Sequence, residues 1–288
     1  AFAAYGFPES HSQSFAALVF FSAWFKFYYP AEFCVGLLRA QPMGFYSPQS
    51  LISDARRHGV TILPVCVNQS KKESDCPSGQ IRLGLNLVKG VGDAAAERIE
   101  AEAPFSGIAD LARRASLSVR QVEALARAGA LECFGVDRRQ AQWAAGIAAT
   151  ESADMLPGLS SVDVPSLPGM SAFELLAADV AHTGVTSTQQ PMALLRSLLD
   201  ARGITPAARL LEVADGTRIV VAGVVTHRQR PQTASDVTFM GLEDETGLMN
   251  VLVSPGLWAR YQRVAGTAKA LVIRGIIRNS TGAPTLIA

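Results

Sequence analysis

The chain has 288 residues, of which 49% are hydrophobic and 18% charged, so it is long enough for two or three domains and too apolar to be disordered. The net charge is +1, but residues 217–288 carry eight Lys or Arg against four Asp or Glu, whereas residues 141–216 carry three against eight. Only the last segment therefore has the basic excess expected of a surface that binds a nucleic-acid backbone.

The chain begins with Ala1 and has no basic leader or cleavage site, so we expect a fragment of a longer protein. Its four cysteines show no C-x-x-C spacing and no His at zinc spacing. We therefore expect reduced, mostly buried thiols in a cytoplasmic protein.

Residues 12–29 form an apolar and aromatic run that ends at a proline. A membrane-spanning helix needs about 20 apolar residues, and Lys26 interrupts this shorter run, so we expect a helix buried on most sides inside the protein. Ser10, His11 and Ser12 lie at its start, where either serine can cap the helix. A His beside Ser is usually part of such a cap, and no acidic partner for a catalytic triad lies nearby.

Residues 48–59 are expected to form a helix that begins near a proline and ends at a glycine. Arg56 and Arg57 lie on this helix. They could face DNA or solvent, and we expect a solvated face.

An apolar segment runs into Gly90-Val91-Gly92, and a strong helix-forming stretch follows at once. Two glycines one residue apart allow positive φ and remove the side chains that would keep a ligand from the main chain. The amides of Val91, Gly92 and Asp93 then lie at a helix start, which favours an anion, and Lys89 lies beside them. These five residues are candidate contacts to a nucleic-acid phosphate, although the same pattern is also compatible with a simple tight turn.

Residues 104–135 repeat the helical pattern, and Ser118 and Gln121 occupy capping-box positions within it. This half is expected to pack against the first, with Arg120 and Arg127 serving packing rather than DNA binding. Residues 150–171 are rich in Pro, Gly and Ser without a period and are expected to form a linker, which two further helical patterns follow.

The last 72 residues are typical of β structure. They predict three strands, a short helix and two further strands, which is the order of an OB-fold. OB-folds hold single strands in a basic groove with stacking side chains. The candidate single-strand contacts are Arg228, Arg230, Phe239, Lys269, Arg274 and Arg278.

Two alternatives remain open in this segment. Phe239 either lines the groove or lies in the barrel core, and alternation along the strand favours the core. Glu243-Asp244-Glu245 is expected to be a solvated turn rather than a metal site.

Five strings in the chain are specific in combination. They are Gly-Phe-Pro-Glu-Ser-His-Ser at 6–12, Tyr-Pro-Ala-Glu-Phe at 29–33, Gln-Pro-Met-Gly-Phe-Tyr at 41–46, Leu-x-x-Val-Lys-Gly-Val-Gly-Asp at 85–93 and Phe-Met-x-Leu-Glu-Asp-Glu-Thr-Gly at 239–247. With them the sequence resembles the C-terminal part of bacterial C-family DNA polymerases, the replicase alpha-subunit family. Pro-Glu before Ser-His and the Gln-Pro-Met-Gly-Phe-Tyr string are similar to the error-prone branch.

The resemblance implies a multidomain α + β fold. Its expected parts are helical fingers over 1–75, a helical tandem helix-hairpin-helix domain over 76–148, a linker and helical connector over 149–215 and a β-barrel OB-fold over 216–288. It places Ser10, His11 and Ser12 in the vicinity of the incoming nucleotide.

The implied function is to hold primer-template duplex and template strand for an error-prone DNA polymerase in translesion synthesis and damage-induced mutagenesis. Polymerase aspartates hold Mg²⁺ in the palm, and no Asp-x-Asp pair lies in an apolar strand here, so we predict no catalytic or metal-binding residue and no cofactor in this chain. The implied partners are DNA, dNTP, an adaptor related to Y-family polymerases and, through it, the sliding clamp. No membrane partner is expected, and the implied location is the bacterial cytoplasm at the nucleoid.

Two other functions compete with this one. The chain could be a freestanding helix-hairpin-helix and OB-fold protein that assists DNA repair, or a purely structural interaction module. The fingers-like N-terminal segment favours the polymerase, because a simple DNA-binding adaptor has no use for it.

Overall fold

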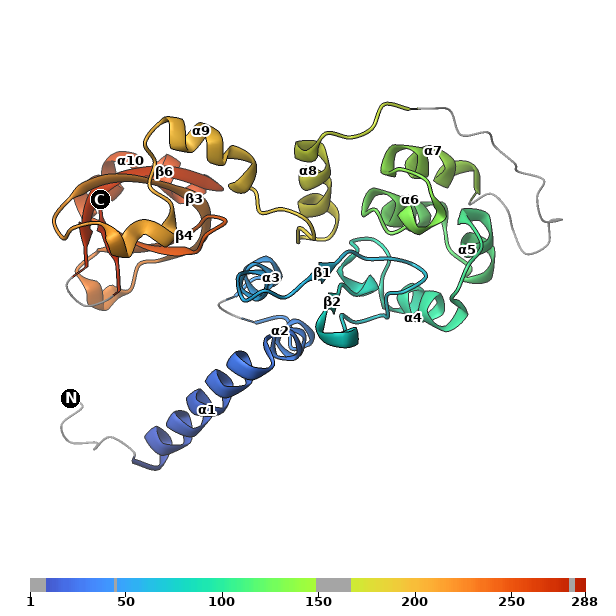
Figure 1. Cartoon of the computed structure of the whole chain (residues 1–288), viewed down its shortest axis with the longest axis horizontal. Coiled ribbons are helices and arrows are strands. Elements are labelled where there is room, and N and C mark those ends of the chain that lie inside the picture. The colour runs from blue at the N-terminus through green and yellow to red at the C-terminus, as the bar shows by residue number, and fades with distance from the viewer. Residues whose placement is uncertain (1–8, 44–45, 149–166, 280–282) are drawn as a thin grey trace.

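The computed structural model describes residues 9–43, 46–148, 167–279 and 283–288 (Figure 1). Residues 6–8 of the string at 6–12, residues 44–45 of the string at 41–46 and most of the predicted linker lie outside these ranges. The described chain forms a helical N-terminal half and a C-terminal β-barrel, joined through a helical connector.

The N-terminal half begins with three helices, α1 (Glu9–Tyr28), α2 (Pro30–Arg39) and α3 (Pro48–Arg57). A parallel pair of short strands follows, β1 (Ile62–Leu63) and β2 (Ile81–Arg82). The remaining helices are α4 (Asp93–Glu102), α5 (Ile108–Arg114), α6 (Val119–Arg127) and α7 (Arg138–Ala148). The capping box predicted for Ser118 and Gln121 is present at the start of α6 and satisfies amides that the helix itself leaves free.

One hydrophobic core runs from α2 through the short sheet to α7. Its fully buried side chains include Ile52 of α3, Ile81 of β2, Ile99 of α4 and Leu125 of α6. Residues on both sides of position 75 therefore share this core. The predicted boundary between a fingers domain over 1–75 and a hairpin domain over 76–148 stays a prediction.

Helix α1 is not buried on most sides, so that prediction was wrong for this chain. Its aromatic side chains are largely in solvent: Phe20 is 66% exposed and Phe27 77% exposed. No element among the described residues covers its outer faces, and its end is fixed by Lys26, which pairs with Asp54 of α3 at 2.9 Å. The apolar pattern of residues 12–29 is typical of a buried helix, but the described residues supply no surface that covers it.

None of the helices in the described ranges is both long and apolar enough to span a bilayer. The four cysteines are free thiols, with Cys34 and Cys66 buried and Cys133 exposed. Burial is the main cause that raises the pKa of Cys34 to about 12, so this thiol is protonated at neutral pH.

The connector contains α8 (Ala172–His182) and α9 (Arg196–Ala201). Figure 1 shows α8 between the barrel and the helical half. A buried ion pair fixes it to α7, because Nη1 of Arg138 lies 2.8 Å from Oδ1 of Asp179. Both side chains are less than 10% exposed, so each depends on the other for compensation of its charge.

The barrel consists of β3 (Arg218–Gln229), β4 (Thr238–Glu243), β5 (Leu248–Val253), α10 (Pro255–Thr267), β6 (Ala270–Arg278) and β7 (Thr285–Ile287). Its strands close in the order β3-β4-β5-β7-β6, with β5 and β7 parallel and the other pairs antiparallel. This is the strand order of an OB-fold. The predicted fold class, helices with a hairpin motif followed by a β-barrel, is confirmed.

Candidate nucleic-acid interface

The loop of residues 89–93, here called the hairpin loop, lies at the surface where a 3₁₀ turn (Leu85–Leu87) leads into α4. Gly90 and Gly92 adopt φ of 94° and 76°, as their predicted turn requires. Both glycines and Asp93 are exposed, whereas Val91 is buried. Gly92 is the N-cap of α4, so the first amides of this helix lack an acceptor within it. The amide of Val91 donates to the carbonyl of Val88 and that of Lys89 to the carbonyl of His182, so neither is free for a ligand. The rest of the loop offers main-chain donors and the positive end of a helix dipole to solvent.

Contacts from α6 hold the hairpin loop in this shape. Nε2 of Gln121 donates to the carbonyl of Val91 at 3.0 Å. A Cβ added at Gly90 would lie 3.5 Å from Cβ of Ala124, an ordinary contact, and one added at Gly92 would meet nothing within 4 Å. Side chains at the two glycines would therefore fit sterically, but they would cover the amides and strain the backbone at positive φ.

Lys89 is tied to the end of α8. Its backbone N–H donates to the carbonyl of His182 and its Nζ to the carbonyl of Ala181, both at 2.8 Å. Cations are favoured at such a helix end. Its ammonium group carries three protons, so after this bond it can still donate to an anion at the loop.

His182 is a feature of this surface that the sequence analysis missed. Burial is the main cause that lowers its pKa, and the charges of Arg127, Lys89 and Arg138 lower it further. Arg127, expected to serve packing, is exposed and pairs with Glu123 at 3.0 Å, while the carbonyl of His182 joins α8 to the amide of Lys89. No local pattern in the sequence could reveal this, because α8 is far along the chain from the loop.

The second helical half offers no comparable loop. Its turn contains Gly129, which is buried, and a Cβ there would collide with the guanidinium of Arg138. Since Arg138 is itself buried against α8, this turn is closed to a phosphate. Arg120 and Arg127 of α6 are both exposed, so a packing role for their side chains stays a prediction.

Ser10, His11 and Ser12 lie in the first turns of α1. The ring of His11 is exposed and packs edge-on against Phe15, with ring centroids 4.4 Å apart. Figure 1 shows this end of α1 extending away from the rest of the molecule. The structure therefore does not bring these three residues together with the hairpin loop.

Two barrel arginines predicted as single-strand contacts already have partners within the chain, Arg228 in a partly buried position and Arg230 at the surface. Nε of Arg228 donates to the carbonyl of Ala265 at 2.6 Å and its Nη2 to that of Ala268, so Arg228 binds the C-terminal end of α10. Arg230 pairs with Asp236 at 3.1 Å. Both would have to release these partners in order to bind a phosphate.

The other predicted barrel residues are at the surface. Phe239 is 38% exposed, whereas its neighbours on β4 at positions 238 and 240 are buried, so the favoured core interpretation of Phe239 was wrong. Side chains on β4 do alternate around this position, but the buried side is that of positions 238 and 240, and Phe239 lies on the exposed side. Lys269 and Arg274 are exposed without an ion pair among the described residues, and Arg278 pairs with Asp215 at 3.3 Å.

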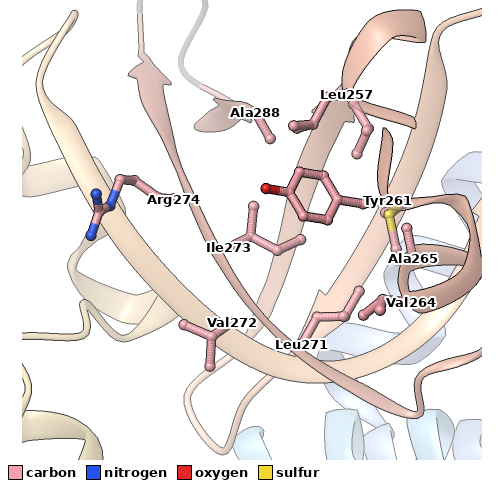
Figure 2. A pocket seen from close by; sticks show the side chains of 11 residues that line it. Leu257, Tyr261, Val264, Ala265, Leu271, Val272, Ile273, Arg274 and Ala288 are labelled. Carbon is pink, nitrogen blue, oxygen red and sulfur yellow. The ribbon is translucent and has the colours of Figure 1, made fainter. Parts of the chain in front are cut away.

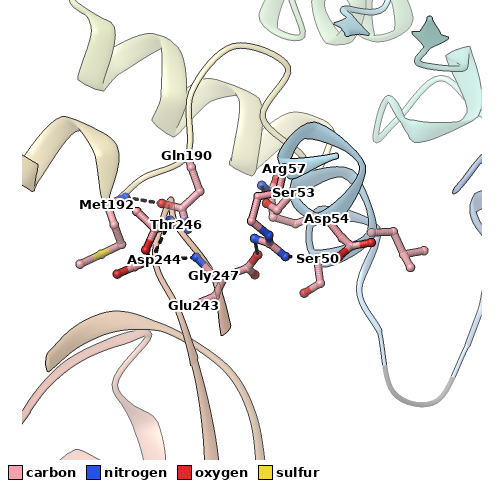
Figure 3. A network of polar contacts seen from close by, with 12 residues as sticks. Ser50, Ser53, Asp54, Arg57, Gln190, Met192, Glu243, Asp244, Thr246 and Gly247 are labelled. Carbon is pink, nitrogen blue, oxygen red and sulfur yellow. Dashed lines mark hydrogen bonds and ion pairs between the residues drawn. The ribbon is translucent and has the colours of Figure 1, made fainter. Parts of the chain in front are cut away.

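The acidic cluster at the end of β4 is not a solvated turn, which corrects that prediction (Figure 3). Glu243 and Asp244 are buried, and Nη1 of Arg57 lies 2.8 Å from Oε1 of Glu243. Arg57 and Arg56 likewise do not form a solvated face, since Nη2 of Arg56 donates to the carbonyl of Thr186 at 2.8 Å. These arginines connect α3 to segments far along the chain, so the helix pattern alone could not show their partners.

The oxygens of Asp244 are fully engaged. They accept the amides of Ala207, Thr246 and Gly247 at 2.8–3.0 Å, the Thr246 hydroxyl at 2.6 Å and Nη2 of Arg196 at 3.2 Å. A carboxylate that accepts five donors has no lone pairs left for Mg²⁺. The cluster does not fit a metal, and no group of three or more possible ligands occurs in the part of the chain that the structure describes.

Comparisons with known proteins agree with this geometry. The family model described as "Helix-hairpin-helix motif" matches residues 59–141, which include the hairpin loop. Over the whole chain, the sequence is 70% identical to the error-prone DNA polymerase of Corynebacterium glutamicum and 69% identical to that of Corynebacterium efficiens. It is 57% identical to that of Mycobacterium tuberculosis, again over the whole of this chain. This chain is related to the error-prone DNA polymerases.

The resemblance inferred from the five strings is thereby confirmed. The chain spans 27% of the length of these error-prone polymerases. One solved structure, an asparaginyl-tRNA synthetase from Pyrococcus horikoshii, matches over 25% of this chain and 18% of its own, at 18% identity and a TM-score of 0.22, which is too low to bear on the fold.

Proposed function

We propose that this chain holds DNA for an error-prone DNA polymerase. In this proposal the hairpin loop binds the backbone of the primer-template duplex, and the barrel binds the single-stranded template. The relatives named error-prone DNA polymerase and the helix-hairpin-helix match support the assignment. Contacts of this kind position the duplex without reading its sequence, which suits an enzyme that copies any template.

The observation that carries the proposal is the open main chain of the hairpin loop. Its exposed glycines leave amides at the start of α4 free for a phosphate oxygen, and the exposed cation Lys89 directly precedes Gly90 in the chain. A phosphate there would gain charge-assisted hydrogen bonds from amides and a cation together.

The reaction of the whole enzyme would be template-directed nucleotidyl transfer. Two Mg²⁺ ions held by aspartates outside this chain would activate the primer oxygen and stabilise the leaving phosphate. Residues 10–12 would lie near the incoming dNTP. We also place the translesion role, the Y-family-like adaptor and the clamp within this proposal, on the strength of the resemblance.

Substitution of Gly90 and Gly92 by Val tests the loop directly. The variant should bind duplex DNA of any sequence more weakly, and the slope of log affinity against log salt should fall by about 1 to 2 as phosphate contacts are lost. Fluorescence anisotropy of a labelled duplex over a salt series measures both.

A matched control is available in Gly203→Val and Gly216→Val. These glycines are also exposed at positive φ, with nothing within 4 Å of an added Cβ, but they lie away from the loop. Equal losses in the two double variants, or unchanged duplex affinity in the first, would refute the assignment of the loop.

A further inference from the structure

The chain carries no carboxylate side chain after Glu245, yet it carries Arg260, Arg263, Lys269, Arg274 and Arg278 there. Apart from Arg278, which pairs with Asp215, none of these cations takes part in an ion pair within the described residues. The excess of positive charge in the last segment is thus concentrated on α10 and β6. A segment with this excess of cations is complementary to a polyanion.

A groove of about 340 Å³ opens between α10 and β6 in this cationic segment (Figure 2). Its wall is apolar, and exposed side chains from both elements contribute to it, among them Tyr261 and Val264 of α10 and Val272 of β6. Arg274 of β6 also lines the groove, and Figure 2 shows its guanidinium directed away from the ring of Tyr261. Exposed apolar surface on elements that carry basic side chains is what an aromatic base with a charged backbone would complement.

The backbone of α10 departs from helical geometry at Tyr261, where φ is −116° and ψ is 17°. Figure 2 shows the ring of Tyr261 lying in the groove, close to Ile273. The guanidinium carbon of Arg260 lies 5.7 Å from the centre of this ring. The kink therefore presents an aromatic ring, half exposed, with a cation beside it.

We propose that the groove between α10 and β6 is a binding site for single-stranded DNA. A base stacks on Tyr261 against the apolar wall, and the flanking phosphates lie at Arg263 and Arg274. This inference rests on the proposed DNA-binding function and assigns it a second site on the barrel, away from Arg228 and Arg230, whose side chains are engaged. A duplex keeps its bases stacked on each other, so the groove selects unpaired bases.

Fluorescence anisotropy of a labelled oligo(dT) with the full chain tests the proposal. Arg263→Glu combined with Arg274→Glu should weaken oligo(dT) binding about tenfold or more, and Tyr261→Leu should weaken it about fivefold or more, while Tyr261→Phe retains it. Affinity for a blunt duplex should change less than about twofold in all of them, because the duplex uses the hairpin loop.

The matched control is Arg202→Glu combined with Arg209→Glu, the same charge change at exposed positions elsewhere. A loss of oligo(dT) affinity equal to that of Arg263→Glu/Arg274→Glu would overturn the site, because it would show an effect of net charge alone. Circular dichroism melting identifies any variant that fails to fold, and photo-crosslinking of iodouracil-containing oligonucleotide to the unmodified chain then decides. A crosslink to Tyr261 supports the groove, and one confined to Phe239 overturns it.

Three further outcomes separate this proposal from its alternatives. If an acidic, aromatic peptide binds the groove and oligo(dT) does not, the groove is a protein-docking site and the proposal fails. If oligo(dT) does not bind but duplex binding still depends on Gly90 and Gly92, the groove assignment fails alone. Absence of both duplex and oligo(dT) binding would instead refute the proposed DNA-binding function.

Discussion

At the scale of residues, the contact between Arg57 and Glu243 joins the helical half to the barrel. The carboxyl group of Glu243 is buried, and the loss of hydration raises its pKa although Arg57 opposes the shift. Burial thus outweighs the attraction of the ion pair, which is common for charges removed from water. We expect the pair to determine which surfaces of α3 and β4 face each other more than to increase net stability.

Arg57→Met should destabilise the chain by about 3 kcal/mol, because it leaves the Glu243 carboxylate buried without its cation, whereas Arg57→Met with Glu243→Met should be close to neutral. A carboxyl group whose pKa is raised in the folded state stabilises the fold most at low pH and loses that contribution as pH rises through its pKa. The damage from Arg57→Met should therefore be smaller at pH 5 than at pH 8. Urea unfolding followed by circular dichroism at both pH values measures this.

Arg202→Met is the matched control, since Arg202 is exposed and takes part in no ion pair within the described ranges. It should change stability by less than about 0.5 kcal/mol. Equal damage in the single and double variants at position 57, or damage independent of pH, would contradict this account.

At the scale of elements, sequence patterns correctly predicted the features that depend on residues close together in the chain. The capping box of α6, the positive φ at Gly90 and Gly92 and the strands of the barrel all follow from residues a few positions apart. Contacts between distant segments did not follow. The partners of Arg57 and Lys89 lie on β4 and α8, and periodicity cannot identify residues that far apart in the chain.

Helix α1 shows a further limit of sequence reasoning. Its apolar pattern predicts a buried helix, but no described part of the chain buries it. Replacing Phe20 and Phe27 with Glu should leave the melting temperature almost unchanged, since both rings lie mostly in solvent, and should reduce self-association. Thermal melting and size-exclusion chromatography with light scattering measure these two effects. As a contrast, Ile52→Ala in the core should cost about 2–5 kcal/mol. A large loss of stability from the α1 variant would mean that the helix is covered in solution.

At the scale of the whole molecule, two surfaces suited to DNA lie on separate structural parts. The hairpin loop belongs to the helical half, and the groove beside α10 belongs to the barrel. The Arg57–Glu243 pair and the connector join these parts, so duplex and single strand could be held at once by one chain. In the proposed function, the open main chain of the hairpin loop binds the duplex backbone.

Amide hydrogen exchange, measured by mass spectrometry with and without a primer-template duplex, tests that claim most directly. Exchange should slow in residues 90–95 when the duplex is present, because their amides would then donate to phosphate oxygens. The same segment in Gly90→Val/Gly92→Val should show much less protection at equal duplex concentration. Unchanged exchange in residues 90–95 of the unmodified chain, with protection confined to other segments at saturating duplex, would contradict the account.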